Sequence, residues 1–580
     1  MIKRLLGCVR EYKLPSIITL LLMVGEVVIE CFIPFITSNL INQMKLGIEM
    51  SKLLTIGVSL VLMAVVSLCC GGIAAYTCAK ASAGFAKNLR KDIFDKIQEY
   101  SFKNIDKFSS SSLVTRLTTD VNNVQMAYMM LIRIAVRSPL MFIFAIIMAY
   151  IMGGALATTF VVVIPVMVFG LIIITRKAMP AFHSVFKKYD KLNESVEENV
   201  RAMRVVKGFS REEYEKEKFS KAADNICMDF TKAERIVAFN GPLMQICLYF
   251  NVLFVLTVGS NLIITNGGAT LGVGQISAML TYGMQILMSL MTLSMIYVMI
   301  TISYESMKRV YEVLTEESTI KNPENPVTEV KDGSLDFENV NFKYSENSQK
   351  YALSNVDIHI ESGMTVGVIG GTGSSKSSLV QLIPRLYDVS EGEVKVGGVN
   401  VKDYDLKVLR DNVAMVLQKN LLFSGTIKEN LKWGNENATD EEMIEACKLS
   451  QADDFVRSFP DGYDTHIEQG GTNVSGGQKQ RLCIARALLK KPKILILDDS
   501  TSAVDTKTDA MIRAGFKKFI PETTKIIIAQ RISSVQDADM IIVMENGAVS
   551  AYGNHSELMD KSEIYREIYE QQTSGGDSDE

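Results

Sequence analysis

A glycine- and serine-rich segment has the composition of a loop that binds phosphate groups. It follows an apolar run at 364–369, which we predict as a buried strand, and it opens a predicted helix at 377–387. In this setting backbone N–H groups and the helix N-terminus point at phosphate oxygens, Lys376 reaches the β- and γ-phosphates, and Ser377 can bind Mg²⁺. Ser375 precedes the lysine where the GxxxxGK[ST] pattern has glycine, and we expect its Cβ to weaken binding. The candidate phosphate-binding residues are Gly370, Gly371, Thr372, Gly373, Ser374, Ser375, Lys376, Ser377 and Ser378.

Two adjacent carboxylates, Asp498 and Asp499, end the apolar run Ile494 to Leu497. The pattern of this run predicts a buried parallel strand, and the tips of such strands are where a doubly wound sheet presents groups to a nucleotide. Asp498 is suited to hold Mg²⁺ through water, and Asp499 lies where a hydrolytic base would be needed. This edge of the sheet is therefore the predicted chemical site.

The segment Val474 to Arg481, reading VSGGQKQR, opens a further predicted helix that continues through Lys490. Serine and glycine amides at a helix N-terminus can bind a phosphate group. A glycine pair would otherwise indicate only a turn, but the phosphate loop upstream favours the phosphate-binding interpretation. The residues concerned are Ser475, Gly476, Gly477 and Gln478.

The elements that must position these groups follow a long apolar N-terminal half. Six apolar stretches there are long enough, or nearly so, to cross a bilayer core of ~30 Å as helices. The first follows a basic segment and is too long for a signal peptide, so we predict a retained span. The links at 80–125 and 176–235 are long and basic, and positively charged links lie on the cytoplasmic side of a membrane. We therefore expect both links, the N-terminus and the chain after residue 300 in the cytoplasm. The stretches are 16–42, 53–79, 138–153, 155–175, 236–264 and 270–300.

Composition excludes several other classes of protein. The net charge of −4 gives no basic surface for nucleic acid, so we expect no nucleic-acid partner. Nine cysteines without a CxxC pair, together with only four histidines, argue against a zinc site and against a disulfide framework.

The phosphate loop, the paired carboxylates and the VSGGQ segment, which is similar to the signature LSGGQ, together resemble the nucleotide-binding domain of an ATP-binding cassette (ABC) protein. The six spans resemble an exporter-type half-transporter, so the resemblance covers nearly the whole chain. It implies a membrane all-α six-helix exporter domain (1–307), a linker (308–330), an α/β P-loop nucleotide-binding domain (331–570) and a disordered tail (571–580). It also implies ATP and Mg²⁺ as cofactors, and a multi-pass protein of the plasma membrane with its N-terminus and ATPase domain in the cytoplasm.

The resemblance assigns roles to further residues. Tyr344 corresponds to the aromatic residue that stacks on adenine, Gln418 to the glutamine that senses Mg²⁺, and Asp505 to the loop that touches the opposite ATP site. The signature residues would bind the ATP of a partner subunit across a dimer interface. In the membrane half, 108–120 and 197–212 resemble the cytoplasmic coupling segments of exporters.

Two further departures from the family pattern matter more than Ser375. Asp499 stands where the family usually has glutamate, and Gln530 stands where it usually has histidine. Aspartate is one methylene shorter, and a misplacement of about 1 Å can cost on the order of 10²-fold in rate. Glutamine cannot take up a proton near neutral pH. We therefore expect the ATP site on this chain's own phosphate loop to bind nucleotide and to hydrolyse it poorly.

With an intact signature, these departures resemble the degenerate-site subunits of heterodimeric bacterial multidrug exporters. The expected partner is a homologous half-transporter that carries the glutamate and the histidine, within membrane lipid. The expected substrate is a small amphipathic or hydrophobic compound, either multidrug or lipid-like. The alternative is a membrane-anchored ATP-binding regulatory subunit that transports nothing itself.

Candidate substrate residues lie in the first and last apolar stretches. Glu26 and Glu30 are one helical turn apart near mid-bilayer, where a carboxylate is costly unless it is paired, hydrated or protonated. Either they face a cavity and favour cationic substrates, or they are protonated or pair with Arg133 or Arg137, which we otherwise expect to extend toward the inner headgroups. The methionine-rich last stretch suits an adaptable cavity wall, although methionines that face lipid or pack between helices are the commoner case. The candidate wall residues are Met284, Met288 and Met295.

Overall fold

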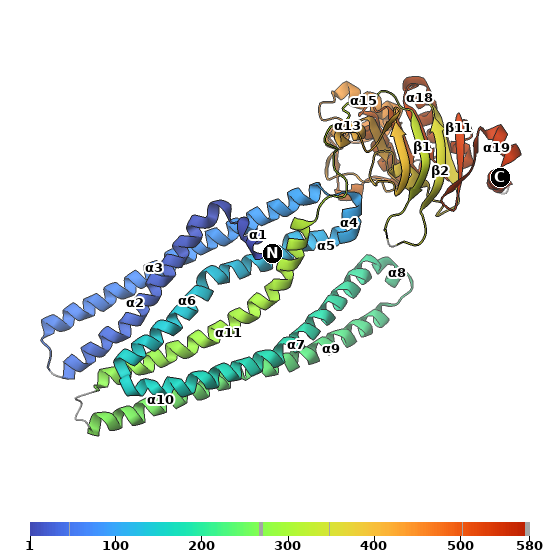
Figure 1. Ribbon diagram of the computed structural model, residues 1–580. Helices are drawn as coiled ribbons and strands as arrows, with labels where there is room; N and C mark the ends of the chain where they lie inside the picture. Colours follow the sequence, from blue (N-terminus) through green and yellow to red (C-terminus); the bar gives the residue numbers. More distant parts are fainter. Residues whose placement is uncertain (46, 266–270, 347, 501–502, 575–580) are drawn as a thin grey trace. The chain divides into compact units, whose positions relative to one another are not determined.

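The computed structural model describes residues 1–45, 47–265, 271–346, 348–500 and 503–574. The chain forms two compact units (Figure 1). The first comprises Met1–Gln98 and Ser110–Glu316 and consists of helices, and the second comprises Glu99–Ser109 and Glu317–Glu580 and contains the β-sheets.

Six helices among the described residues are long and apolar enough to cross a membrane, which confirms the six predicted spans. Most extend well beyond their apolar stretch, because charged and polar turns continue the same helix. They are α2 (Lys13–Lys45), α3 (Met50–Gln98), α6 (Val121–Gly153), α7 (Thr159–Arg201), α10 (Asn240–Thr265) and α11 (Val273–Thr315).

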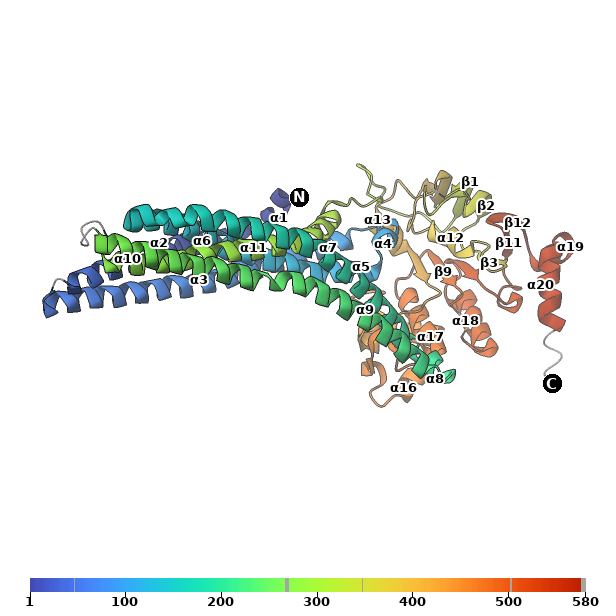
Figure 2. The same ribbon diagram turned by 90° about the horizontal axis from the view of Figure 1, so that it is seen from below.

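The two long basic links are largely helical. The second link doubles back at the short helix α8, so that α7 and α9 lie side by side in both views (Figures 1 and 2). An ion pair of 2.5 Å between Lys188 and Asp229 joins these two helices. The shorter elements of this unit are α1 (Ile2–Gly7), η1 (Arg10–Tyr12), α5 (Ser110–Thr115), the π-helical turn η2 (Arg116–Asp120), η3 (Gly154–Thr158), α8 (Met203–Gly208) and α9 (Glu212–Ala238).

The tip of the first link, helix α4 (Phe102–Phe108), belongs to the second unit. Ser101 caps this helix in a capping box with Asn104. Both residues also bond to the segment that follows α11: the Ser101 hydroxyl lies 2.6 Å from that of Thr319, and the Asn104 amide donates to the Glu317 carbonyl at 3.1 Å. Residues distant in sequence therefore build one compact body.

The second unit contains a largely parallel sheet with the strand order β12-β11-β3-β10-β9-β6 and an antiparallel sheet with the order β2-β1-β4-β5. The two strands predicted at 364–369 and Ile494 to Leu497 are present as β3 and β9. Strand β10 pairs in parallel with both β3 and β9. It therefore lies between β3, which precedes the phosphate loop, and β9, which ends in the carboxylates. The strands are β1 (Leu335–Phe342), β2 (Leu353–Ile360), β3 (Thr365–Gly370), β4 (Glu391–Val396), β5 (Val399–Asn400), β6 (Val413–Val416), β7 (Gly425–Thr426), β8 (His466–Ile467), β9 (Ile494–Asp498), β10 (Thr524–Ile528), β11 (Met540–Glu545) and β12 (Ala548–Gly553).

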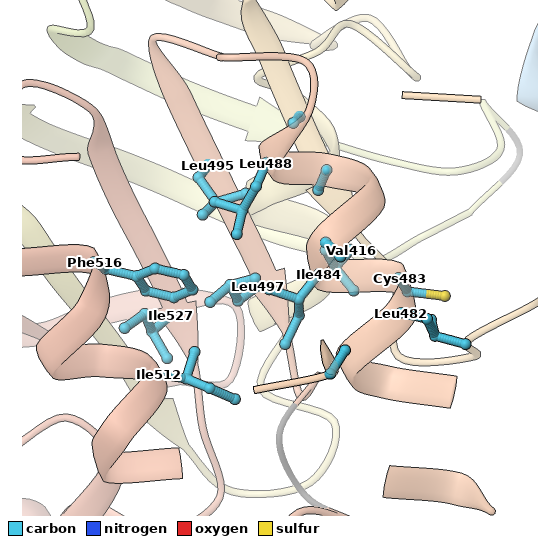
Figure 3. Packing of buried hydrophobic residues seen from close by; sticks show 14 of the residues in the cluster. Val416, Leu482, Cys483, Ile484, Leu488, Leu495, Leu497, Ile512, Phe516 and Ile527 are labelled. Carbon is cyan, nitrogen blue, oxygen red and sulfur yellow. The ribbon is translucent and has the colours of Figure 1, made fainter. Parts of the chain in front are cut away.

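Strand β9 is buried on both faces, as its continuous apolar run predicts. Leu495 and Leu497 pack in one cluster with Ile484 of α17 and Phe516 of α18 (Figure 3), whereas Ile496 belongs to a second cluster on the other face of the sheet. This double burial fixes the end of the strand, where the carboxylates follow. The helices of this unit, besides α4, are α12 (Lys376–Gln381), α13 (Leu406–Asn412), α14 (Ile427–Lys432), α15 (Asp440–Leu449), α16 (Asp453–Ser458), α17 (Gly476–Leu488), α18 (Thr506–Phe519), α19 (His555–Lys561) and α20 (Glu563–Ser574).

Several expected boundaries differ from the observed ones. The helix predicted over 377–387 ends at Gln381, because Pro384 lacks an N–H and disfavours helical backbone in the residue before it. The first residues of the expected linker, 308–315, are helical, since α11 continues to Thr315. The expected disordered tail begins too early, since 571–574 is helical as the end of the helix Glu563–Ser574, and 575–580 lies outside the described residues.

Candidate nucleotide site and membrane cavity

The phosphate loop connects the end of β3 to the start of α12. The Lys376 ammonium donates hydrogen bonds to the carbonyls of Gly370 at 2.8 Å and Gly371 at 2.9 Å, so the loop wraps around its own lysine. A Cβ on Gly370 would lie 2.2 Å from the Met544 carbonyl oxygen, and only glycine fits there. Burial lowers the pKa of Lys376, and the two nearby carboxylates oppose that shift.

Ser375 adopts the backbone conformation that glycine normally supplies. Its φ of 70° and ψ of 25° lie in the left-handed region, where a Cβ crowds the backbone at a cost of roughly 1–2 kcal/mol. The substitution of glycine by serine therefore leaves the loop's shape intact and adds strain to it.

Asp498 and Ser377 meet at the expected Mg²⁺ position. The Ser377 hydroxyl donates to Asp498 Oδ1 at 3.0 Å, and only 4% of Asp498 is exposed. Burial raises the pKa of the Asp498 carboxyl, the Ser377 bond opposes the rise, and the charge of Asp499 adds to it. A hydroxyl and a carboxylate side by side form an oxygen donor set that fits a hard divalent cation.

Asp499 is held by two side-chain amides. Gln530 Nε2 donates to Asp499 Oδ2 at 2.8 Å, and Gln418 Nε2 lies 3.4 Å from the same oxygen. The backbone N–H of Asp499 donates to the Ile528 carbonyl at 3.1 Å, and its φ is 49°. The structure thus brings together three residues that the sequence singled out separately.

Tyr344 lies beside the first turn of α12. Its hydroxyl is 2.8 Å from that of Ser378, and its ring packs edge-on against Phe342 and Tyr387, with centroids 4.8 and 5.2 Å away. The Tyr387 hydroxyl in turn donates to Asp106 of α4 at 2.7 Å. Burial and the bond to Asp106 raise the pKa of Tyr387. Sequence reasoning missed Tyr387, since nothing in its local pattern distinguishes it from any other aromatic residue at a helix end.

The signature residues form the N-terminus of α17. Ser475 and Gln478 form a capping box, in which the Ser475 N–H donates to Gln478 Oε1 at 2.9 Å. A Cβ on Gly477 would lie 2.8 Å from the Ala503 carbonyl oxygen, so this position requires glycine. Asp505 caps the neighbouring helix α18 by accepting from the Thr508 N–H at 2.9 Å, and this bonding lowers the pKa of its carboxyl.

The two membrane glutamates are paired. Arg137 Nη2 donates to both carboxylate oxygens of Glu30, at 2.8 and 2.9 Å, and Arg137 Nε lies 3.5 Å from Glu26 Oε1. Of the interpretations that the sequence left open, pairing with an arginine is the one observed.

A cavity of about 730 Å³ lies between α2, α6 and α11. Glu26, Met284 and Met288 contribute to its wall, while Met295 lines a second cavity of about 470 Å³ together with Met288. Arg133 and Arg137 also line the larger cavity, and Arg137 pairs there with Glu26 and Glu30. Their expected extension toward the inner headgroups stays a prediction. The carboxylates on α2 hold Arg137 inward.

Comparison with known proteins agrees with this fold and site. The sequence pattern of the family ABC transporter transmembrane region matches residues 16–321, and that of the family ABC transporter matches 353–502. The chain belongs to the ABC transporter family, as a half-transporter that fuses a transmembrane and a nucleotide-binding domain. It is a multi-pass protein of the plasma membrane with a cytoplasmic ATPase domain, and its ATP hydrolysis is coupled to transport.

Relatives match along most of the chain. The uncharacterized ABC transporter ATP-binding protein YfiB of Bacillus subtilis is 35% identical over 98% of both chains. A second protein of that organism, the uncharacterized ABC transporter ATP-binding protein YknU, is 33% identical over 83% of this chain and 82% of its own. The solved structure of a bacterial Atm1-family ABC exporter with ATP bound has the same fold, with a TM-score of 0.81 at 23% identity over 97% of this chain and 98% of that one.

Proposed function

We propose that the chain is one subunit of a heterodimeric ATP-driven exporter, and that the ATP site on its own phosphate loop binds nucleotide but hydrolyses it poorly. The observation that carries this proposal is the bonding of Asp499. Gln530 and Gln418 both direct amide groups at Asp499 Oδ2. A hydrolytic base must accept one proton from the attacking water, and Oδ2 is one of the two carboxylate oxygens that could do so.

The geometry also shortens the reach of this carboxylate. Aspartate extends one methylene less than glutamate from the end of β9, and a misplacement of about 1 Å can cost on the order of 10²-fold in rate. Gln530 can hold the carboxylate in place but cannot exchange a proton near neutral pH. Both residues thus favour a site that retains ATP over one that turns it over.

The residues expected to bind ATP and Mg²⁺ are all present in this site. Ser377, Gln418 and Asp498 would hold Mg²⁺, partly through water, and the ion would neutralise charge on the phosphates. Lys376 and the loop amides would bind the phosphates, and Tyr344 would stack on adenine, with its hydroxyl held by Ser378.

The intact signature supports a dimer of unlike subunits. Ser475, Gly476 and Gly477 open a well-capped helix that can serve ATP bound to a partner, whereas two copies of this chain would combine two impaired sites. The expected partner is a homologous half-transporter with glutamate and histidine at the positions of Asp499 and Gln530. The pair would export a small amphipathic compound.

The test is to purify the full-length chain alone and, separately, assembled with a candidate partner, and to reconstitute both in liposomes. We expect the chain alone to hydrolyse ATP on the order of 10²-fold more slowly than the pair, because only the pair contains a competent base. A photoreactive ATP analogue should be retained longer on this chain than on its partner. Rapid hydrolysis by the chain alone would refute the proposal, and ATP-driven flux in the liposomes distinguishes a transporter from a regulatory subunit.

A further inference from the structure

We infer that the cavity between α2, α6 and α11 binds an amphipathic anion, whose charged group pairs with Arg133. The inference rests on the proposed exporter function and adds the charge class of the substrate. Its basis is the distribution of charge around the cavity. The carboxylates of Glu26 and Glu30 are paired with Arg137, whereas the guanidinium of Arg133 forms no ion pair among the described residues.

The acidic side chains have little capacity left for a cationic ligand. Glu30 binds Arg137 through both of its oxygens, and the side chain of Glu26, which is 13% exposed, lies 3.5 Å from the same guanidinium. The other oxygen of Glu26 has no hydrogen-bond partner among the described residues, but it is buried toward α3, since a Cβ on Gly71 would lie only 3.2 Å from it, and a ligand in the cavity cannot reach it. A cation in the cavity would therefore have to compete with Arg137 for both carboxylates.

Arg133 is in the opposite situation. It lies one helical turn before Arg137 on α6, lines the cavity and is exposed. Within the described part of the chain it makes no hydrogen bond and no ion pair. A cation inside the membrane region is costly unless it is hydrated or paired. A carboxylate, sulfonate or phosphate group on a ligand would provide that partner through charge-assisted hydrogen bonds.

The rest of the wall suits the apolar body of such a ligand. Met23, Met141, Met284 and Met288 present flexible side chains that adapt to varied shapes. Gln285 adds a polar group, since its Oε1 is buried with no hydrogen-bond partner among the residues that the structure describes, and it could accept from an N–H or O–H of the ligand. The volume of about 730 Å³ is that of a pocket for one drug-sized molecule.

The test measures equilibrium binding to the full-length chain in nanodiscs of zwitterionic lipid without nucleotide. The two probes are 11-(dansylamino)undecanoate and its analogue with trimethylammonium in place of the carboxylate, each corrected for binding to empty nanodiscs. We expect the chain to bind the anion at least about tenfold more tightly than the cation, because a hydrogen-bonded charge pair contributes about that factor.

Variants of Arg133 locate the effect. Arg133→Gln should weaken binding of the anion about tenfold and leave binding of the cation nearly unchanged, and Arg133→Lys should keep the preference for the anion. Arg204→Gln, on the exposed surface of α8, is the matched control and should change neither affinity. Equal affinities for the two probes, no binding of either, or an unchanged anion affinity in Arg133→Gln would overturn the inference. Absence of ATP-driven flux with the binding preference intact would instead overturn the proposed function.

Discussion

The side-chain amide of Gln530 donates a 2.8 Å hydrogen bond to Oδ2 of Asp499. The two residues follow neighbouring parallel strands, β10 and β9, whose pairing sets the distance between their side chains. In this geometry the neutral amide of Gln530 fixes the position of the Asp499 carboxylate. The amide cannot itself accept a proton near neutral pH. An ATP site built this way favours binding over turnover.

Replacing both residues should restore hydrolysis. We expect Asp499→Glu with Gln530→His to raise ATP hydrolysis in the chain without a partner on the order of 10²-fold, because the longer carboxylate recovers its reach and the imidazole can carry a proton. Steady-state phosphate release measures the effect. Gln530→Ala is the control, since it removes one amide partner of Asp499 without lengthening the carboxylate side chain, and it should give little gain. An unchanged rate in the double variant would show that another group limits turnover.

Relieving the strain at Ser375 should strengthen the phosphate loop. Glycine adopts the left-handed conformation without a Cβ clash, so we expect Ser375→Gly to stabilise the loop by about 1 kcal/mol and to lower the Kd for ATP severalfold. The neighbouring Ser374→Gly is the comparison, because Ser374 has no positive φ, so glycine relieves no strain there and only removes the 3.3 Å hydrogen bond from Lys376. Isothermal titration of the full chain with ATP compares the two, and equal Kd values would contradict the strain argument.

The bond between Tyr387 and Asp106 should matter for coupling. Tyr387→Phe keeps the ring packed against Tyr344 but removes a hydrogen bond to a carboxylate that contributes about 1.5–3 kcal/mol. We expect faster amide hydrogen exchange in α4 and fewer molecules exported per ATP hydrolysed. Tyr351→Phe, which loses an exposed 3.1 Å bond to Glu391, is the control and should change neither quantity. Unaltered exchange in α4 would refute this role of the hydroxyl.

Removing the membrane guanidinium should destabilise the helices around it. Arg137→Gln leaves Glu26 and Glu30 without their partner, and we expect a loss of about 2 kcal/mol or more, reduced from the fully buried case because Arg137 is 41% exposed. The fraction that stays monodisperse after heating in detergent reports the loss. Combining Arg137→Gln with Glu26→Gln and Glu30→Gln removes all three charges and should recover most of the lost stability. No recovery would mean that lost packing, and not an unpaired charge, causes the destabilisation.

Local patterns predicted most of this fold. The apolar runs specified six spans, and the continuous run Ile494 to Leu497 specified a strand buried on both faces. The phosphate loop and the VSGGQ segment were recognisable because their spacing is local. The helix after Lys376 is shorter than its apolar pattern predicts, because Pro384 disfavours helical backbone just beyond its end.

Contacts between distant segments could not be predicted in the same way. The sequence offered both Arg133 and Arg137 as partners for the glutamates, and only the packing of α2 against α6 selects Arg137. The contact of Tyr387 with Asp106 joins residues far apart in the chain, and no periodicity encodes it. The grouping of Gln418 with Gln530 around Asp499 likewise depends on strand order.

The inclusion of α4 in the second unit has a practical consequence for protein engineering. Residues 99–109 fold against the ATPase unit although the membrane half surrounds them in sequence. A chimera that exchanges nucleotide-binding domains between half-transporters at residue 331 would replace Tyr387 but keep its hydrogen-bond partner Asp106 from the recipient. Such exchanges should be designed with two crossover regions, so that residues 99–109 and the ATPase domain come from the same half-transporter.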